Sequence, residues 1–304
     1  MPSEQDRTAD LLKKVRKIEI KTRGLSDQLF SGGYHSAFKG RGMSFSEVRG
    51  YQYGDDVRAI DWNVTARLDD TFVKVFEEER EITVMLVVDI SASTLFGTQL
   101  SKEGEPAFKQ DIITELCALL AFSASNNNDK VGAVLFSETV QTYLPPKKGR
   151  NHILRIIREL LAAPALTQGT DLADVLRHLS NVLKKRSIVF IISDFIQTGP
   201  EYRDELSLLR KRHDVVGIQV FDQREAEMPD LGLVHVRDAE TGELAWIDTS
   251  NRQTRLEYEA WFRSNQAQAK ERFLRSGADF LSISTRDSYV QALMGLFARR
   301  GKRR

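Results

Sequence analysis

The sequence predicts an α/β fold with a doubly wound, mostly parallel sheet that carries helices on both faces. Short apolar runs rich in β-branched residues alternate with longer amphipathic segments, which is typical of β–α–β units. The clearest run, residues 82–88, is apolar nearly throughout and ends at Asp89, as expected for a central strand buried on both sides. An N-terminal helix and an irregular or β segment are expected to precede this sheet.

Length and composition restrict the class of protein. The 304 residues suffice for one large α/β domain and a smaller piece, and a net charge of +1 gives no sign of a nucleic-acid partner. The single cysteine, Cys117, cannot form an internal disulfide, so a reducing compartment is expected. The sequence shows no signal peptide and no apolar stretch of the ~18 residues that span a bilayer, so we expect a cytoplasmic protein.

Residues 1–79 are expected to form a helix and a family-specific segment packed on the main domain. Residues 8–21 place Leu11, Val15 and Ile18 on one side of a helix and basic residues on the other. Such a helix either docks with a solvated outer face or lies on an anionic membrane, so peripheral membrane contact stays open. Glycines in residues 31–45 predict a loop, and alternation in residues 72–77 predicts a strand.

Between that loop and that strand lies a segment dense in arginine and carboxylates. It forms either a docking surface or a network of Arg–carboxylate pairs that fixes an irregular segment in place, and we favour the structural role. The residues of this network are Arg49, Asp55, Asp56, Arg58, Asp61, Trp62 and Arg67. Trp62 and Ile60 are expected to be its buried anchors.

The main domain, residues 80–304, is expected to continue the alternation. Strands are predicted at residues 82–89, 131–136, 139–144, 188–192, 215–221 and 278–283. Helices are predicted at residues 107–125, 150–161, 172–183, 202–212, 254–276 and 289–299.

Other segments of this domain are expected to be irregular. Residues 95–106 are polar and predict a loop, Pro145-Pro146 should end a strand, and the basic residues after 299 predict a disordered tail. Residues 233–237 and 244–248 bracket the turn signal Glu240-Thr241-Gly242, so a hairpin insertion is expected near residues 230–250.

Polar side chains follow two of the buried strands. Asp89, Ser91 and Ser93 come directly after the central strand, Asp194 follows the strand at 188–192, and Thr170 precedes a helix. In open α/β sheets the carboxyl ends of the strands are where ligands bind. Each motif alone also fits a helix cap or an Asx-turn. The three together, each at a junction between a strand and a helix, are more specific.

Two carboxylates and three hydroxyls are hard oxygen donors, which suit Mg²⁺ and do not suit zinc. Because most of these donors are neutral, a bound ion would stay electrophilic towards a further carboxylate. The spacing Asp-x-Ser-x-Ser, then Thr170, then Asp194, resembles the metal-ion-dependent adhesion site of von Willebrand factor A domains. This resemblance implies a Rossmann-like sheet that binds Mg²⁺, Mn²⁺ or Ca²⁺ and an acidic side chain of a protein partner.

A second resemblance rests on the segment before the central strand. It contains F-S-E-V-R and, further on, Y-G-D-D-V-R-x-I-D-W, and it is similar to a bacterial family catalogued as domain of unknown function fifty-eight. Members join this segment to a von Willebrand factor A-like domain and are commonly encoded beside MoxR-type AAA+ ATPases. The resemblance implies such an ATPase, or its substrate, as partner. Many members carry N-terminal transmembrane helices; none is expected from the present sequence, so membrane anchoring is not expected here.

Three functions are compatible with these residues. We favour a non-catalytic, metal-dependent interaction module, an adaptor or partner of the ATPase. The alternative is a Mg²⁺-dependent phosphoryl-transfer hydrolase with Asp89 as nucleophile, but such hydrolases carry a second acid where this chain has Ser91. In a third interpretation, the fold keeps the five residues of the motif for structural reasons only, and they bind no ion. The sequence shows no Ser-His-Asp or Cys-His pattern and no ligand cluster for zinc.

Overall fold

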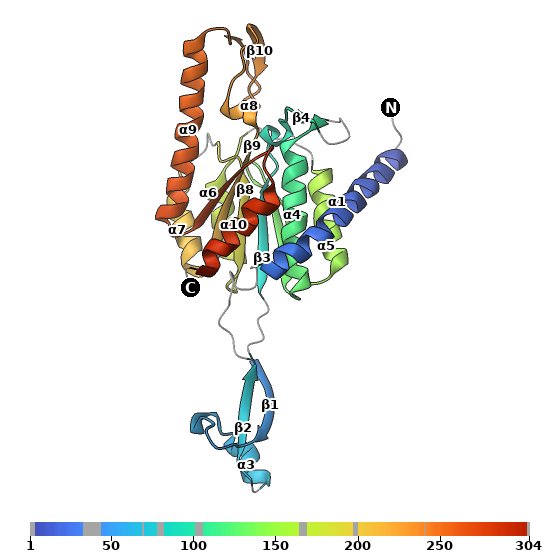
Figure 1. Cartoon of the computed structure of the whole chain (residues 1–304), viewed down its shortest axis with the longest axis vertical. Helices are drawn as coiled ribbons and strands as arrows, with labels where there is room; N and C mark the ends of the chain where they lie inside the picture. The colour runs from blue at the N-terminus through green and yellow to red at the C-terminus, as the bar shows by residue number, and fades with distance from the viewer. Residues whose placement is uncertain are drawn as a thin grey trace. The chain divides into compact units, whose positions relative to one another are not determined.

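The structure of the protein is a computed structural model that describes residues 4–32, 44–68, 70–77, 82–100, 106–163, 169–196, 200–239 and 241–302. The chain divides into two compact units, one made of Met1–Ala37 and Ile82–Arg304 and the other of Phe38–Glu81 (Figure 1). The N-terminal helix therefore belongs to the same unit as the sheet, here called the main unit. That the second unit packs on the main unit stays a prediction.

A six-stranded sheet forms the centre of the main unit, with the strand order β12-β9-β8-β3-β6-β7. Its strands are β3 (Thr83–Asp89), β6 (Lys130–Phe136), β7 (Val140–Lys147), β8 (Ile188–Ser193), β9 (Asp214–Phe221) and β12 (Asp279–Ser284). All neighbours pair in parallel except β6 and β7, which are antiparallel at one edge. Strand β3 is fully buried from Val84 to Val88, as its apolar sequence requires. The predicted mostly parallel α/β sheet is confirmed.

Helices cover both faces of this sheet (Figure 1). On one face lie α4 (Lys109–Asn126), α5 (Arg150–Ala162) and α10 (Tyr289–Lys302), with α1 (Glu4–Gly32) packed across all three. On the other face lie α6 (Leu172–Val182), α7 (Arg203–Arg212) and α9 (Arg252–Arg275). The apolar core between sheet and helices fixes the strand ends, and these ends carry the candidate site.

Helix α1 is longer than its sequence pattern predicts. The apolar periodicity ends near residue 21, yet the helix continues to Gly32 because Thr22 and Ser26 are fully buried against the protein. The Thr22 hydroxyl donates to Ile18 O at 2.7 Å, and Asn126 of α4 donates to Ser26 Oγ at 3.3 Å. Residues 33–43, where a loop was expected, lie outside the described residues.

Three other expectations are wrong in detail. Strand β7 continues through Pro145 and Pro146, which an edge strand tolerates because its outer side needs no donor. Helix α10 takes in most of the basic tail, because buried Arg300 pairs with Asp214 and Asp279. The loop expected at residues 95–106 contains two short strands, β4 (Gln99–Leu100) and β5 (Pro106–Ala107).

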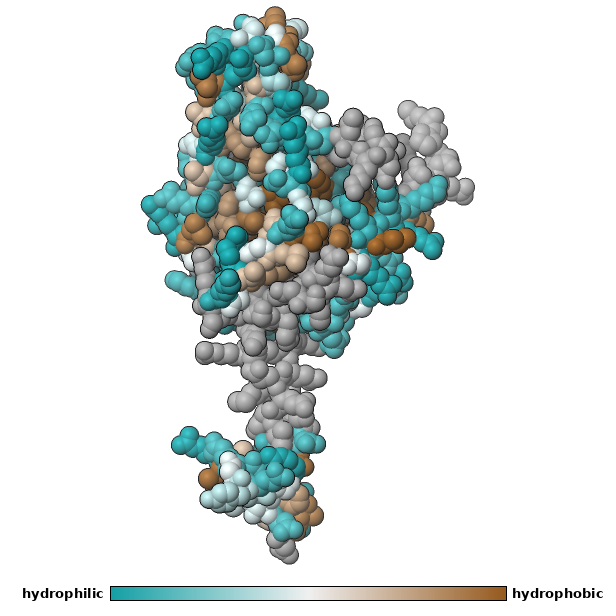
Figure 2. Space-filling model, in the orientation of Figure 1, coloured by the Kyte–Doolittle hydropathy of each residue, from teal (hydrophilic) through white to brown (hydrophobic). Residues whose placement is uncertain are grey.

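The predicted hairpin insertion is formed by β10 (Leu233–Arg237) and β11 (Leu244–Asp248), which pair antiparallel. Its outward face exposes Leu233, Leu244 and Trp246, and hydrophobic colour is visible around the hairpin at the top of Figure 2. His235 stacks on Trp246 with ring centroids 4.7 Å apart. The hairpin follows the short helix α8 (Gln223–Ala226), which contributes to the site described below.

None of the helices in the described ranges has the combination of length and apolar character that crossing a membrane requires.

The close packing of α9 on the sheet leads to the first prediction. A Cβ added at Gly217 of β9 would meet the Phe273 ring at 2.6 Å, whereas one added at Gly24 of α1 meets nothing within 4 Å. Gly217→Ala should lower the free energy of unfolding by about 1–3 kcal/mol, because the ring has to move. Gly24→Ala should raise it by about 0.5–1 kcal/mol, since alanine favours the helix. Urea unfolding measures both, and equal effects of the two substitutions would contradict this packing.

Candidate functional site

The site begins where β3 ends. Asp89 is the last residue of that strand, and its carboxylate turns back on the following loop: Oδ1 accepts the N–H of Ser91 at 2.8 Å. The Ser91 and Ser93 hydroxyls lie 3.0 Å apart, and a one-turn 3-10 helix (Ala92–Leu95) holds them in place. Thr94 fixes the turn by donating its hydroxyl to Ser91 O at 2.7 Å. The predicted Asp-x-Ser-x-Ser motif therefore forms one compact group of oxygens.

Strand β8 supplies the second carboxylate at the neighbouring strand end. Ser193 donates its hydroxyl to Asp89 Oδ2 at 2.6 Å and accepts the N–H of Phe195 at 3.0 Å. The carbonyl of Asp194 accepts from the Gln219 side chain at 2.9 Å. Phe195 has a φ of +54°, which a bulky residue adopts only at a cost, and its ring is held 5.1 Å from the ring of Phe273. Aromatic packing thus fixes the loop that presents Asp194.

The loop that carries Thr170 reaches the same edge of the sheet. The N–H of Asp171 donates to Ser137 O at 3.2 Å, and Ser137 directly follows β6, the other neighbour of β3. Gly169 has a φ of +89°, which turns the chain into this position. Asp171 caps α6 by accepting the N–H of Asp174 at 3.0 Å, and Thr170 is buried beside it. Asp89, Ser91, Ser93 and Asp194 therefore lie at or directly after the ends of the adjacent strands β3 and β8, whereas Thr170 lies in the loop before α6, which the Asp171 N–H joins to the residue after β6.

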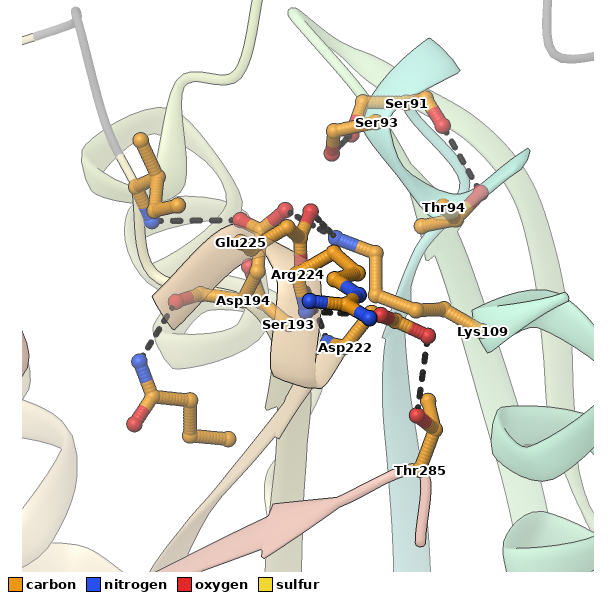
Figure 3. Close-up of polar contacts among 12 residues, drawn as sticks. Ser91, Ser93, Thr94, Lys109, Ser193, Asp194, Asp222, Arg224, Glu225 and Thr285 are labelled. Carbon is orange, nitrogen blue, oxygen red and sulfur yellow. Dashed lines mark hydrogen bonds and ion pairs between the residues drawn. The ribbon is translucent and has the colours of Figure 1, made fainter. Parts of the chain in front are cut away.

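A buried lysine is the unexpected member of the site. Lys109, the first residue of α4, has a side chain that is only 1% exposed. Its ammonium donates to Asp194 Oδ2 at 3.0 Å and to Glu225 Oε1 at 2.6 Å. Figure 3 shows the ammonium between these two carboxylates, with Ser91 and Ser93 nearby. A cation of the protein itself therefore already compensates one of the two strand-end carboxylates.

The carboxylate of Asp222 fixes the start of α8. Asp222 accepts the hydroxyl of Thr98 at 2.6 Å. It also accepts the hydroxyl of Thr285 at 3.0 Å (Figure 3). Its backbone N–H donates to Glu225 Oε2 at 2.8 Å. These bonds join the loop after β3, the end of β9 and the end of β12, so Glu225 is held firmly beside Lys109.

The electrostatics follow from burial and from charge pairing. Burial, together with the neighbouring Asp194, raises the pKa of Asp89 to about 6, although the bonds from Ser193 and Ser91 oppose this. Burial and Asp194 also raise the pKa of Glu225, against the lowering effect of Lys109. For Lys109 burial favours the neutral amine, but the two carboxylates prevail and raise its pKa. The ammonium therefore stays charged, whereas Asp89 is held by hydrogen bonds from Ser193 and Ser91 and has no ion pair among the described residues.

The donors fit a hard divalent cation. Asp89 and Asp194 are 2% and 3% exposed, and Ser91 and Ser93 add neutral hydroxyl oxygens beside them. Burying an anion without full compensation is costly, so a cation near Asp89 would stabilise the site. Within the part of the chain that the structure describes, no three His, Cys, Asp or Glu side chains form a cluster suited to a metal. Metal binding here would therefore depend on the hydroxyls as well as on the carboxylates.

The Arg-rich segment lies in the second unit, where β1 (Ser44–Gly50) pairs antiparallel with β2 (Phe72–Glu77). Arg49 forms a bidentate pair with Asp55 at 2.8 Å for both contacts, and Asp61 lies 3.4 Å from the Lys74 ammonium. These contacts show that part of the predicted network is structural. They join residues within the second unit.

Other residues of that segment serve local structure or face solvent. Asp56 caps a short 3-10 helix (Val57–Ala59) by accepting the N–H of Arg58, and Arg58 and Arg67 are exposed. Trp62, the first residue of α3 (Trp62–Leu68), is 68% exposed, so the second unit itself does not bury it, and its expected burial against the main unit stays a prediction. Ile60 is only half-buried.

Lys109, Glu225 and the contact of Ser193 with Asp89 were not found from sequence. For Glu225 a signal exists: Asp222 and Glu225 are spaced as a helix capping box, and both reciprocal bonds are present. For Lys109 there is no local signal, because its partners lie 85 and 116 residues away in the chain.

The fold and the site together define an α/β module of the von Willebrand factor A-like class. Over residues 47–268 the chain matches the family described as protein of unknown function DUF58, and it belongs to this family. Uncharacterised proteins of Mycobacterium bovis and Mycobacterium tuberculosis are each 35% identical over 232 residues, which covers 75% of this chain and 70% of theirs. The family resemblance noted in the sequence is confirmed.

A solved structure supports the fold. The crystal structure of an aerotolerance-related membrane protein from Bacteroides fragilis superposes with a TM-score of 0.51 at 15% sequence identity. The match covers 73% of this chain and 100% of that chain. At this level of identity the likeness concerns the architecture of the sheet and its helices.

The bond between Ser193 and Asp89 leads to the second prediction. Ser193→Ala leaves Asp89 Oδ2 without its donor and the N–H of Phe195 without its acceptor, so we expect a loss of about 1–3 kcal/mol in unfolding free energy. Urea unfolding in EDTA measures this loss. Ser180→Ala is the control, because among the described residues that hydroxyl bonds only to Leu176 O of its own helix. Equal midpoints for the two variants would show that the bond between the strand ends contributes nothing.

Proposed function

We propose that the protein is a non-catalytic, divalent-metal-dependent protein-interaction module. Asp89, Ser91, Ser93 and Thr170 would hold the ion directly or through water, and Asp194 would act through water or orient the other donors. Mg²⁺ is the favoured ion, with Mn²⁺ or Ca²⁺ as substitutes. The bound ion would supply an electrophilic position for an acidic side chain of the partner.

One observation carries this proposal. Two buried carboxylates and a pair of serine hydroxyls 3.0 Å apart meet at the carboxyl ends of neighbouring parallel strands. That edge is where α/β sheets bind ligands, and hard oxygen donors of mixed charge suit a divalent cation that keeps part of its hydration.

The alternative, a phosphoryl-transfer hydrolase that uses Asp89 as nucleophile, gains no support from the geometry. The hydrogen bonds that Asp89 accepts from the Ser91 N–H and the Ser193 hydroxyl are compatible with a metal ligand and with a nucleophile, so they do not favour the hydrolase. Ser91 occupies the position where such hydrolases carry their second acid, and its hydroxyl contacts Ser93. We therefore keep the non-catalytic role as part of the proposal.

The family resemblance provides the candidate partner, a MoxR-type AAA+ ATPase. In this proposal the ATPase supplies the mechanical work and the present chain supplies recognition. Leu233, Leu244 and Trp246 are exposed on the hairpin that follows α8, and they offer apolar area to a protein bound at this end of the sheet. A cytoplasmic location, as expected from the sequence, stays a prediction.

The third prediction tests this function by binding. A MoxR-type ATPase from the same genome, immobilised for interferometry, should bind the full chain in Mg²⁺ and release it in EDTA. Asp89→Ala should weaken binding roughly tenfold or more, because the ion loses its charged ligand. Asp174→Asn is the matched control, since this exposed carboxylate on α6 pairs only with Arg177 in the part of the chain described.

Binding that persists in EDTA and in Asp89→Ala would contradict the metal-dependent mode. The absence of any binding by the wild-type chain, in Mg²⁺ and with nucleotide present, would exclude this ATPase as the partner.

A further inference from the structure

Lys109 places a fixed positive charge inside the candidate metal site. The ammonium lies 3.0 Å from Asp194 Oδ2, and the side chain is 1% exposed, so no solvent screens it from the site. The nearby Asp222 and the N–H of Arg224 hold α8 in place, and α8 presents Glu225 to the same ammonium. The ammonium is therefore enclosed between the carboxylates of Asp194 and Glu225, and hydrogen bonds hold both of these in place.

We propose that the Lys109 ammonium competes with the divalent cation for Asp194 and thereby weakens metal binding at the Asp89 site. This inference rests on the proposed function, since it concerns the same ion. A divalent cation held by Asp194, directly or through water, would be repelled by an ammonium bonded to the same carboxylate. Metal binding that uses Asp194 would require the ammonium to move towards Glu225, whose Oε1 already accepts from it at 2.6 Å.

The position of the lysine connects the site to its surroundings. Lys109 begins α4, and its backbone N–H donates to Phe96 O in the loop after Ser93. Glu225 lies on α8, directly before the hairpin insertion. A site weakened in this way would bind the ion less tightly in the free chain than in a complex, where a partner's carboxylate completes the coordination. Metal binding and partner binding would then occur together.

The fourth prediction uses a charge-neutral double substitution. Lys109→Met alone leaves Asp194 and Glu225 buried without a counter-charge, which can unfold the protein. Lys109→Met/Glu225→Gln removes one positive and one negative charge, so the net charge of the site is unchanged. Replacing a buried pair by neutral residues is often tolerated. A change in metal affinity in this variant therefore reports the freed Asp194 rather than the overall field.

The experiment measures Mn²⁺ binding by the full chain. The free ion is quantified by electron paramagnetic resonance, and the affinity is measured independently by calorimetry. The double variant should bind Mn²⁺ roughly tenfold or more tightly than wild type. Adding Asp89→Ala to it should abolish the gain. Lys21→Met/Glu115→Gln is the matched control, because it removes an ion pair between α1 and the same helix α4. The control should bind Mn²⁺ like wild type.

The outcomes separate this inference from the proposed function. Asp89-dependent binding that is measurable in wild type and tighter in the double variant supports the inference. Equal or weaker Asp89-dependent binding in the double variant overturns the inference and leaves the metal site standing. If neither the wild type nor the double variant binds Mn²⁺, both the inference about Lys109 and the proposed metal site are overturned.

Discussion

Asp89 and Asp194 lie buried at the ends of neighbouring strands β3 and β8, and the repulsion between their carboxylates is the constraint on which the rest of the site depends. The sheet cannot separate them, because the strands pair in fixed register and the β3 core is fully buried. Compensation comes from three directions. Ser193 and the Ser91 N–H donate to Asp89, the N–H of Ile196 donates to Asp194, and the Lys109 ammonium neutralises Asp194. Asp89 alone receives no cation from the described part of the chain, and this is where a metal ion would add most.

The same compensation joins elements that are distant in the sequence. Lys109 links the first turn of α4 to the loop after β8 and to α8, while Asp222 binds Thr98 and Thr285 across the sheet. The candidate site is therefore continuous with the base of the hairpin insertion. Such continuity is what an interaction module requires, because a partner that touches the insertion then also meets the residues that govern the ion. Most polar atoms that surround the two carboxylates thus serve both the fold and the site.

How much could be predicted from the sequence follows from how local each feature is. A buried parallel strand shows itself as an apolar run, and the donors Asp89, Ser91 and Ser93 lie within four residues of its end, so the fold and the core of the site were predictable. Lys109 was not, because its role depends on contacts across 85 and 116 residues. The extension of α1 beyond residue 21 depends on the packing of Thr22 and Ser26 within the main unit. Tertiary packing decided each of these features.

The most direct test of the account is thermal unfolding of the full chain in EDTA and in increasing Mg²⁺, for wild type, Asp89→Ala and the control Asp174→Asn. An ion at ~100 times its Kd adds about 2.7 kcal/mol to stability, and each kcal/mol raises the Tm of a domain of this size by about 2–4 °C. The account predicts a saturable rise in Tm for wild type and for Asp174→Asn, and none for Asp89→Ala. An unchanged Tm in wild type, or an equal rise in Asp89→Ala, would contradict a metal site built on Asp89.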